Sequence, residues 1–241
     1  MDVSDFAGGV RADNLLLSVA EHLKVPLTTI ARQAELGQLT GRVELTDAAA
    51  IRTQATAALT LVESYLLGLE LMSQQGSLQL EPVSVSSTLM DAAHDLDRFA
   101  KHYQVQLEVE VGGKFGPVMS HPGGLRAALL SLGFALVEAQ AAQDIEGPRR
   151  IIMATHRTPL GIVTGIYGKY EALSAERWRS ALGLAGRARQ PITSLTPGSG
   201  AGLFVADTIL RSMHTKLRVG RYLKQSGLAA TLQASQQLSF V

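Results

Sequence analysis

The stretch LLSVAEHLKVPLTTIARQA, residues 16–34, decides the architecture of the N-terminal part of the chain. Its apolar residues recur at alternating spacings of four and three: Leu16, Ala20, Leu23, Leu27, Ile30 and Ala34. This is the heptad spacing that aligns one face of an α-helix. The sequence therefore predicts a helix with a continuous apolar seam, which Gly37 and Gly41 bring to an end.

A second seam of the same spacing follows. Thr46 or Asp47 can cap a helix N-terminus, and apolar residues then recur up to Gly76: Ile51, Ala55, Ala58, Val62, Tyr65, Leu69 and Met72. Two consecutive helices that each carry an apolar heptad seam predict an antiparallel hairpin. Since one hairpin cannot bury both seams, we expect two hairpins to pair as a four-helix bundle, which makes the protein a homodimer. The alternative, a hairpin that packs on the rest of its own chain, stays open.

Composition narrows the classes of protein without naming a partner. The 241 residues are 46% hydrophobic and carry a net charge of +1, which does not indicate binding to nucleic acid or to an anionic membrane. The chain has no cysteine, begins without the pattern of a signal peptide, and has no apolar run near the roughly 20 residues that span a bilayer. We expect a cytoplasmic protein without a membrane segment.

After Gly76 the apolar period changes, and residues 77–241 predict a mixed α/β domain. We expect strands at residues 78–85, 105–111, 118–119, 151–157 and 161–168, and helices from Ser86 or Ser87 to His102 and at residues 121–142, 175–184 and 202–214. The helix at 121–142 is apolar on almost every side and is therefore expected to be buried. Residues 185–200 form a loop long enough for a lid, and a C-terminal hairpin is expected to turn near Gln225 to Gly227.

This order of parts resembles the sensor histidine kinase family, in which a dimerisation and phosphotransfer hairpin precedes a Bergerat-type ATP-binding domain. The resemblance implies an α+β fold with an N-terminal tail at residues 1–11, a hairpin at 12–76 and an α/β sandwich of the histidine kinase ATPase type at 77–241. The segment EHLKVPLTTI, residues 21–30, is similar to the family's phosphoacceptor box, and Leu23, Lys24, Pro26 and Leu27 match it.

The phosphoacceptor position of that box holds Glu21, and the histidine stands one residue later as His22. One residue turns a helix by about 100°, so His22 does not simply inherit the role. With Ala20 and Leu23 pointing inward, we expect His22 on the outward, solvent-accessible face. Three interpretations stay open: an ordinary surface histidine, a displaced phosphoacceptor, or a residue that contacts a partner.

A second segment, residues 196–213, is similar to the family's second glycine box. Gly198, Gly200, Gly202 and Leu203 match its pattern, and a predicted helix follows. Such glycines let backbone N–H groups and a helix N-terminus approach phosphates without an intervening Cβ. The resemblance therefore implies that these four residues are the candidates for contact with a nucleotide.

The family's other nucleotide boxes are eroded. Aligned on the buried helix, Ser131 and Ala135 stand where the resemblance implies the asparagine that holds Mg²⁺. Glu138, one turn further, is either a substitute ligand or, as we expect, a glutamate at a solvated helix end. No metal site is expected.

The adenine-reading Asp-x-Gly-x-Gly aligns with Gly168, Tyr170 and Ala172, and no aspartate occurs between Asp144 and Asp207. Losing such a charge-assisted hydrogen bond costs about 1.5–3 kcal/mol. Tyr167 and Tyr170 are candidates to fill the adenine pocket instead.

These residues predict a degenerate histidine kinase that acts in two-component signalling as a dimeric regulator or scaffold. The alternative is an active histidine kinase, or a histidine phosphotransferase that passes phosphate through His22. No cofactor is expected in the first case, whereas retained nucleotide binding would require ATP and Mg²⁺. The expected partners are a second copy of the chain and either a response regulator receiver domain or a partner histidine kinase.

Overall fold

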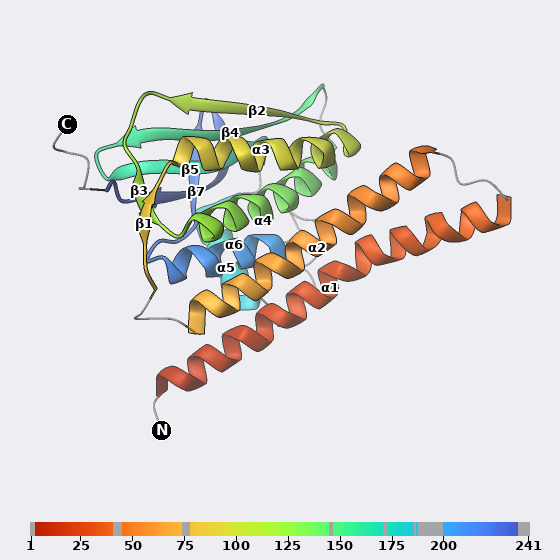
Figure 1. Ribbon diagram of the computed structural model, residues 1–241, viewed down its shortest axis with the longest axis horizontal. Helices are drawn as coiled ribbons and strands as arrows, with labels where there is room; N and C mark the ends of the chain where they lie inside the picture. The colour runs from red at the N-terminus through yellow and green to blue at the C-terminus, as the bar shows by residue number, and fades with distance from the viewer. Residues whose placement is uncertain are drawn as a thin grey trace.

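A long helical hairpin lies against an α/β domain (Figure 1). The computed structural model describes residues 3–40, 45–73, 78–144, 147–170, 173–185, 187 and 200–235. The hairpin consists of α1 (Val3–Thr40) and α2 (Leu45–Ser73). Helix α1 begins within the stretch that we assigned to a tail, and Pro26 lies inside it. The expected lid, residues 185–200, lies almost entirely outside the described residues.

The α/β domain follows the predicted order of strands and helices. Its elements are β1 (Glu81–Val83), α3 (Val85–His102), β2 (Val105–Gly112), β3 (Val118–Ser120), α4 (Pro122–Ala141), β4 (Arg149–Thr158), β5 (Gly161–Gly168), α5 (Ala175–Leu184), α6 (Ala201–Ser212), β6 (Arg218–Tyr222) and β7 (Gln225–Leu232). The main sheet has the order β2-β4-β5-β7-β6, and β1 pairs with β3 separately. Only β2 and β4 run parallel within the main sheet. The predicted α+β fold is confirmed.

Two local predictions are wrong by a few residues. The N-cap of α3 is Ser84, whose Oγ accepts from the backbone N–H of Ser87 at 3.3 Å, rather than Ser86 or Ser87. The last hairpin turns at Leu223 and Lys224, both with positive φ, rather than near Gln225 to Gly227. In both cases short-range hydrogen bonding shifts the boundary of an element that the sequence pattern predicts correctly.

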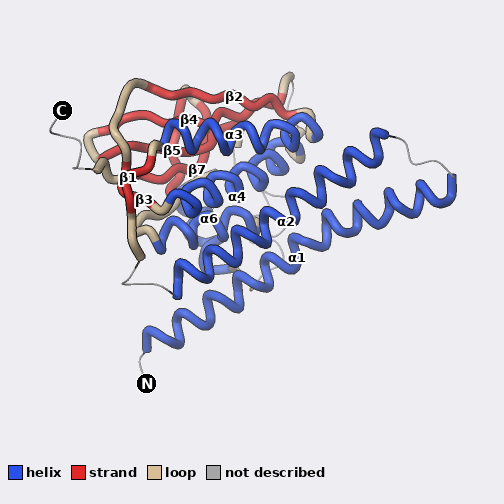
Figure 2. The backbone as a smooth tube through the Cα atoms, in the orientation of Figure 1, coloured by secondary structure: helices blue, strands red, loops and turns tan. Residues whose placement is uncertain are grey.

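The helices α3, α4 and α6 form a layer between the main sheet and the hairpin (Figure 2). Helix α4 is the centre of this layer, and Leu125, Leu136 and Val137 on it are completely buried. Residues 48–73 and 122–141 are each long and apolar enough to span a membrane by length and composition. Most of the second segment is enclosed by the domain, as is common for a core helix.

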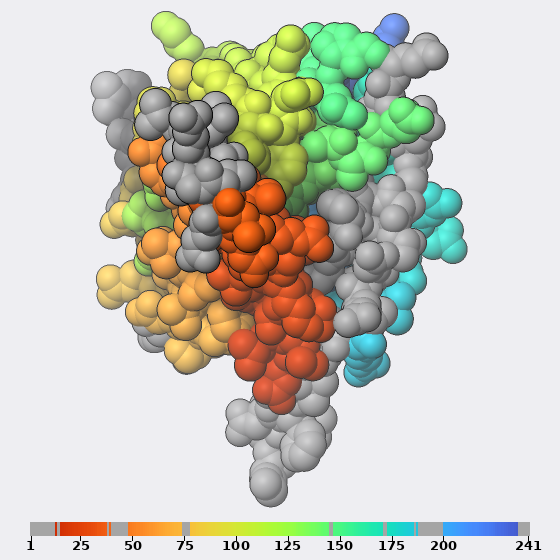
Figure 3. Space-filling model, turned by 90° about the vertical axis from the view of Figure 1, so that its right-hand side faces the viewer, coloured from red at the N-terminus to blue at the C-terminus, as the bar shows by residue number. Residues whose placement is uncertain are grey.

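The hairpin packs on its own domain through one face and leaves its α1 seam outside. Leu15 and Val19 of α1 are buried, whereas Leu16 and Leu27 of the predicted seam are 51% and 57% exposed. The seam of α2 is mostly buried or half-buried, and a Cβ at Gly68 would stand 3.3 Å from Ile209 on α6. Figure 3 shows α1 as a ridge on the surface of the molecule. The hairpin thus has an intramolecular contact and a separate exposed apolar face.

Candidate functional site

The candidate site is the junction at which the hairpin meets α4 and α6. One small cavity there has walls from α1, α4 and α6. Its lining includes His22 and Pro26 from α1, Ser131, Ala135 and Glu138 from α4, and Gly202 from α6. These are the positions that the sequence assigns to the phosphoacceptor box, the metal-binding helix and the glycine box. The fold therefore brings three segments that are far apart in the chain to a single place.

His22 points into this junction. Its side chain is only 13% exposed, and its Nε2 lies 3.5 Å from Oε2 of Glu138. Its Nδ1 is buried and has no hydrogen-bond partner among the described residues. The prediction of a solvent-accessible His22 is wrong, because the face that carries Leu15 and Val19, rather than the heptad seam, packs on the domain.

Glu138 is also buried, so the prediction of a solvated helix end is wrong. Burial raises the pKa of its carboxyl group to about 7, and burial also lowers the pKa of His22. Desolvation penalises the charged form of each group. The two partners therefore favour a neutral acid facing a neutral imidazole, despite their short separation.

Two polar residues that sequence reasoning missed complete the surroundings of Glu138. Gln54 Nε2 on α2 donates to the hydroxyl oxygen of Tyr103 at 3.1 Å. Burial, and then the charge of Glu138, raise the pKa of Tyr103. Because 49 residues separate Gln54 from Tyr103 in the chain, no local pattern could have paired them.

The two positions aligned with the metal-binding asparagine are covered by α6. Ser131 is fully buried and Ala135 is 2% exposed. A Cβ at Gly202 would overlap the carbonyl oxygen of Ser131 and stand 3.1 Å from the Cβ of Ala135. Gly202 thus allows α6 to pack directly on α4. The cavity that remains measures about 20 Å³, which is room for about one water molecule.

The rest of the glycine box also has structural roles in this fold. Gly200 has a φ of +69° and is the N-cap of α6, a conformation that suits a residue without a Cβ. Leu203 is completely buried in the core. Gly198 lies outside the described residues. Of the four candidate nucleotide contacts, Gly202 thus packs α6 on α4, Gly200 begins α6 and Leu203 lies in the core.

The position of the adenine-reading aspartate is occupied by other side chains. A Cβ at Gly168 would stand 2.5 Å from Oε1 of Gln140 and 2.9 Å from the ring of Tyr170. The Tyr170 hydroxyl donates to the carbonyl oxygen of Leu136 at 2.8 Å, and the backbone N–H of Lys169 donates to Gln140 Oε1 at 3.1 Å. Ala172 lies outside the described residues.

The two tyrosines that the sequence offers as pocket fillers lie in different hydrophobic clusters. Tyr170 is 1% exposed and packs in the main core beside α4. Tyr167 belongs to a separate cluster with Ile152 and Ala229, and its ring lies 5.4 Å from that of Tyr222. Since alternate residues of a strand point to opposite faces, Tyr167 faces away from α4, and the prediction for this residue is wrong.

No protein-family model and no curated protein sequence matches the chain. Solved structures do match it. The histidine kinase AdeS of Acinetobacter baumannii aligns with a TM-score of 0.55 at 12% identity, over 89% of this chain and 98% of that one. Full-length ShkA in complex with AMPPNP aligns with a TM-score of 0.54 at 17% identity, over 79% of this chain and 39% of that one. The chain therefore has the fold of a histidine kinase hairpin and catalytic domain.

Proposed function

We propose that the protein is a degenerate histidine kinase that acts in two-component signalling through protein contacts rather than through phosphoryl transfer from ATP. The observation that carries this proposal is the pair Gln140 and Tyr170, which fill the position of the adenine-reading carboxylate. Fold alone does not imply function, so the argument rests on these side chains.

The filled position removes both the group and the space that an adenine needs. Tyr170 has its hydroxyl bound to Leu136, and its ring is enclosed by the core. Moving it would expose a fully buried aromatic side chain, which costs about 1.5–3 kcal/mol by transfer alone. ShkA was solved with AMPPNP, whereas here a nucleotide would first have to displace part of the core.

The phosphate side of the pocket supports the same conclusion. The contact of Gly202 with Ser131 and Ala135 closes the space in which a metal ion and phosphates would lie. Neither aligned residue offers the carboxylate or amide oxygen that Mg²⁺ prefers. Among the described residues, the cavity that Ser131, Ala135 and Gly202 line measures about 20 Å³, far less than the roughly 300 Å³ at which ligand pockets begin.

The exposed apolar face supports a homodimer. Leu16 and Leu27 on α1 and Leu59 and Leu66 on α2 are each more than half exposed. The two leucines of α2 stand one heptad apart, which suits the packing of a four-helix bundle. A dimeric body could then present its outer surface to a receiver domain or to a partner histidine kinase.

Isothermal titration with Mg·ATP tests the proposal that side chains fill the nucleotide pocket. We expect no saturable binding at micromolar concentrations, with a catalytically competent histidine kinase in the same buffer as the positive control.

Light scattering tests the dimer, where we expect wild type and Leu160→Glu to be dimeric and Leu59→Glu/Leu66→Glu to be monomeric. Leu160 is 82% exposed on the β4–β5 turn and serves as the matched control. Micromolar ATP affinity at the positions aligned with the family's nucleotide site, or a wild-type monomer, would contradict the corresponding part of the proposal.

A second candidate function is histidine phosphotransfer through His22. The observation that favours it is the Nδ1 of His22, which has no hydrogen-bond partner among the described residues and could form an N–P bond as the aspartyl O–P bond of a phosphorylated receiver breaks, with the Nε2 proton released to solvent. His22 is 13% exposed, so the hairpin would first have to leave α4. Incubation with a phosphorylated receiver domain tests this. Acid-labile label that is lost in His22→Ala but kept in His94→Ala would establish the relay.

A further inference from the structure

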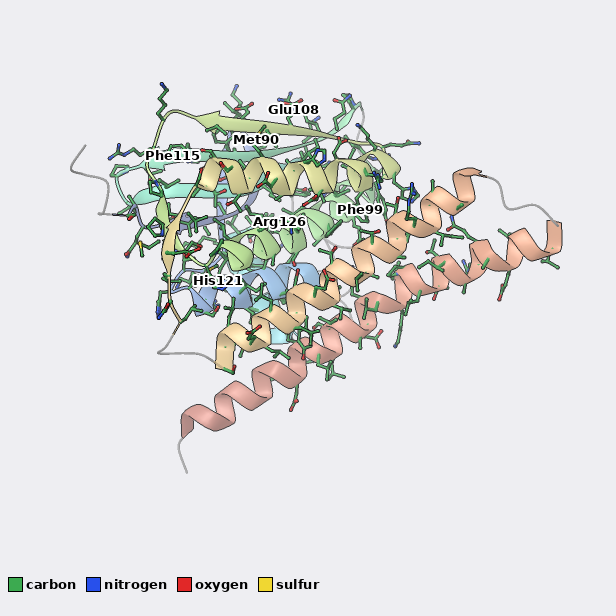
Figure 4. The ribbon with its side chains drawn as sticks, in the orientation of Figure 1. Met90, Phe99, Glu108, Phe115, His121 and Arg126 are labelled. Carbon is green, nitrogen blue, oxygen red and sulfur yellow. The ribbon has the colours of Figure 1, made fainter. Side chains whose placement is uncertain are left out.

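A second and larger cavity lies between the hairpin and the domain and adjoins the first, with which it shares Ala57, Phe99 and Phe134. This cleft measures about 420 Å³ and is bounded by α2, α3 and α4. Each helix contributes an arginine to its lining: Arg52 from α2, Arg98 from α3 and Arg126 from α4. Figure 4 shows Arg126 on α4 and Phe99 near the C-terminal end of α3.

The lining holds three arginines and three acidic residues, and Lys101 beside the cleft adds one further positive charge. Arg126 is neutralised by an ion pair with Asp95, and Asp97 is paired with Lys101 at 2.6 Å. Arg52 and Arg98 have no ion-pair partner among the described residues, and Glu63 is the one other acidic residue of the lining. Two guanidinium groups thus face one free carboxylate. Planar guanidinium groups suit carboxylate and phosphate ligands in particular.

The floor of the cleft is apolar. Phe99 and Phe134 pack edge to face with ring centroids 4.7 Å apart, and Leu130 lies one turn before Phe134 on α4. On the opposite wall, the hydroxyl groups of Thr56 and Thr60 stand one turn apart on α2. A ligand that fits would therefore combine an apolar body, which covers the floor, with an anionic group at the arginines.

We propose that this cleft binds a small organic anion, with a ring or short apolar body that carries a phosphate or a carboxylate. The volume lies within the range of about 300–1,000 Å³ that small-molecule sites have. Because Arg52 belongs to the hairpin and Arg98 to the domain, one anion would tie the two parts together. Binding of this anion would fix the position of the hairpin on the α/β domain. The arrangement that partners contact would then depend on the concentration of a soluble compound.

Calorimetric titration with phenyl phosphate and with benzoate tests the site. We expect saturable one-to-one binding of at least one of them, and the tighter of the two identifies the anionic group. Inorganic phosphate, which lacks the apolar body, should bind at least tenfold more weakly than phenyl phosphate. The absence of saturable binding of both aromatic probes up to about 10 mM, or equal binding of inorganic phosphate, would overturn the proposal.

Matched arginine variants locate the binding. Arg52→Ala/Arg98→Ala should weaken the better probe at least tenfold, since charge-assisted hydrogen bonds each contribute one to two decades of affinity. Arg177→Ala/Arg179→Ala on α5 removes the same charge elsewhere and should leave the affinity unchanged. All four arginines are exposed, so both variants are expected to fold. Equal affinities in the two double variants would overturn the proposal.

The outcome of this test does not depend on the proposal that the nucleotide pocket is filled. If Mg·ATP binds to wild type and loses its affinity in Arg52→Ala/Arg98→Ala, the nucleotide occupies the cleft through its phosphates, which supports the cleft and leaves the filled adenine position intact. If Mg·ATP binds equally to both proteins, the pocket proposal fails while the result with the aromatic probes decides the cleft.

Discussion

The region that aligns with the family's nucleotide site has an adenine end at Gln140 and Tyr170 and a hairpin end at His22 and Ser131, and the two ends differ in how well their polar groups are satisfied. At the adenine end, the Tyr170 hydroxyl donates to Leu136 and the Oε1 of Gln140 accepts from Lys169, and of these groups only the Nε2 of Gln140 is buried without a partner among the described residues. At the hairpin end, the Nδ1 of His22 and the Oγ of Ser131 are buried without partners among the described residues. A satisfied buried network adds stability, whereas unsatisfied groups lower it. The first end holds the domain together, and the second makes the hairpin contact weaker and more readily reversed.

The largest expected effect is at the adenine end. Tyr170→Ala should lower the free energy of unfolding by about 3–5 kcal/mol, because it removes a fully buried aromatic ring. Tyr170→Phe keeps the ring and should cost only about 1 kcal/mol for the lost hydrogen bond. Urea denaturation measures both. If the alanine variant costs no more than the phenylalanine variant, Tyr170 is not part of the core.

At the hairpin end, Glu138→Gln should stabilise the protein in a pH-dependent way. The pKa of Glu138 is raised from 4.5 to about 7, so its contribution to stability is present below pH 4.5 and is lost as the pH rises through about 7. One pKa unit corresponds to about 1.4 kcal/mol, which makes the variant more stable by on the order of 3 kcal/mol at pH 8.

The same urea series at pH 5 is the control for Glu138→Gln, since only the unfolded state is then ionised and the difference should fall to below about 1 kcal/mol. His22 faces Glu138 at 3.5 Å, so the series is repeated in a His22→Ala background, which removes the titration of His22 from the difference. A difference that does not change between pH 5 and pH 8 would show that Glu138 is not buried in solution.

Restoring the family's aspartate should not restore the nucleotide site. Gly168→Asp places a side chain against Gln140 and Tyr170, and such overpacking costs about 1–3 kcal/mol. Gly183→Asp is the control, because a Cβ at Gly183 has nothing within 4 Å. Denaturation gives the stabilities and Mg·ATP titration gives the binding. Tight ATP binding by Gly168→Asp would mean that the adenine space is open.

The smallest effect concerns the buried hydroxyl group at the hairpin end, compared with a hydrogen-bonded hydroxyl group at the C-terminal end of α6. Ser131→Ala removes a buried hydroxyl without a partner and should leave the protein equally stable or slightly more stable. Ser212→Ala removes a buried hydroxyl that donates to Ile209 at 2.7 Å and should cost about 1 kcal/mol. Thermal unfolding distinguishes them. An equal loss in both variants would indicate that Ser131 has a partner after all.

Most of the fold could be predicted from periodicity and turn residues. The heptad spacings predict the hairpin, and the apolar period of residues 121–142 predicts the buried helix α4. The orientation of α1 could not be predicted, because apolar residues lie on two of its faces and the more regular face is the exposed one. His22 was therefore placed on the wrong side, and Glu138, which faces it, was placed in solvent.

The sequence by itself determined which chemical groups the protein lacks: no histidine at the position of Glu21, no asparagine at Ala135 and no aspartate at Gly168. Only the tertiary structure decided what stands in their place. Tyr170 fills one position, Gly202 closes another, and three arginines surround a cleft that no local motif announces. The physical reason is that an absent side chain can be read from a single position, whereas packing depends on which distant residues reach the same space.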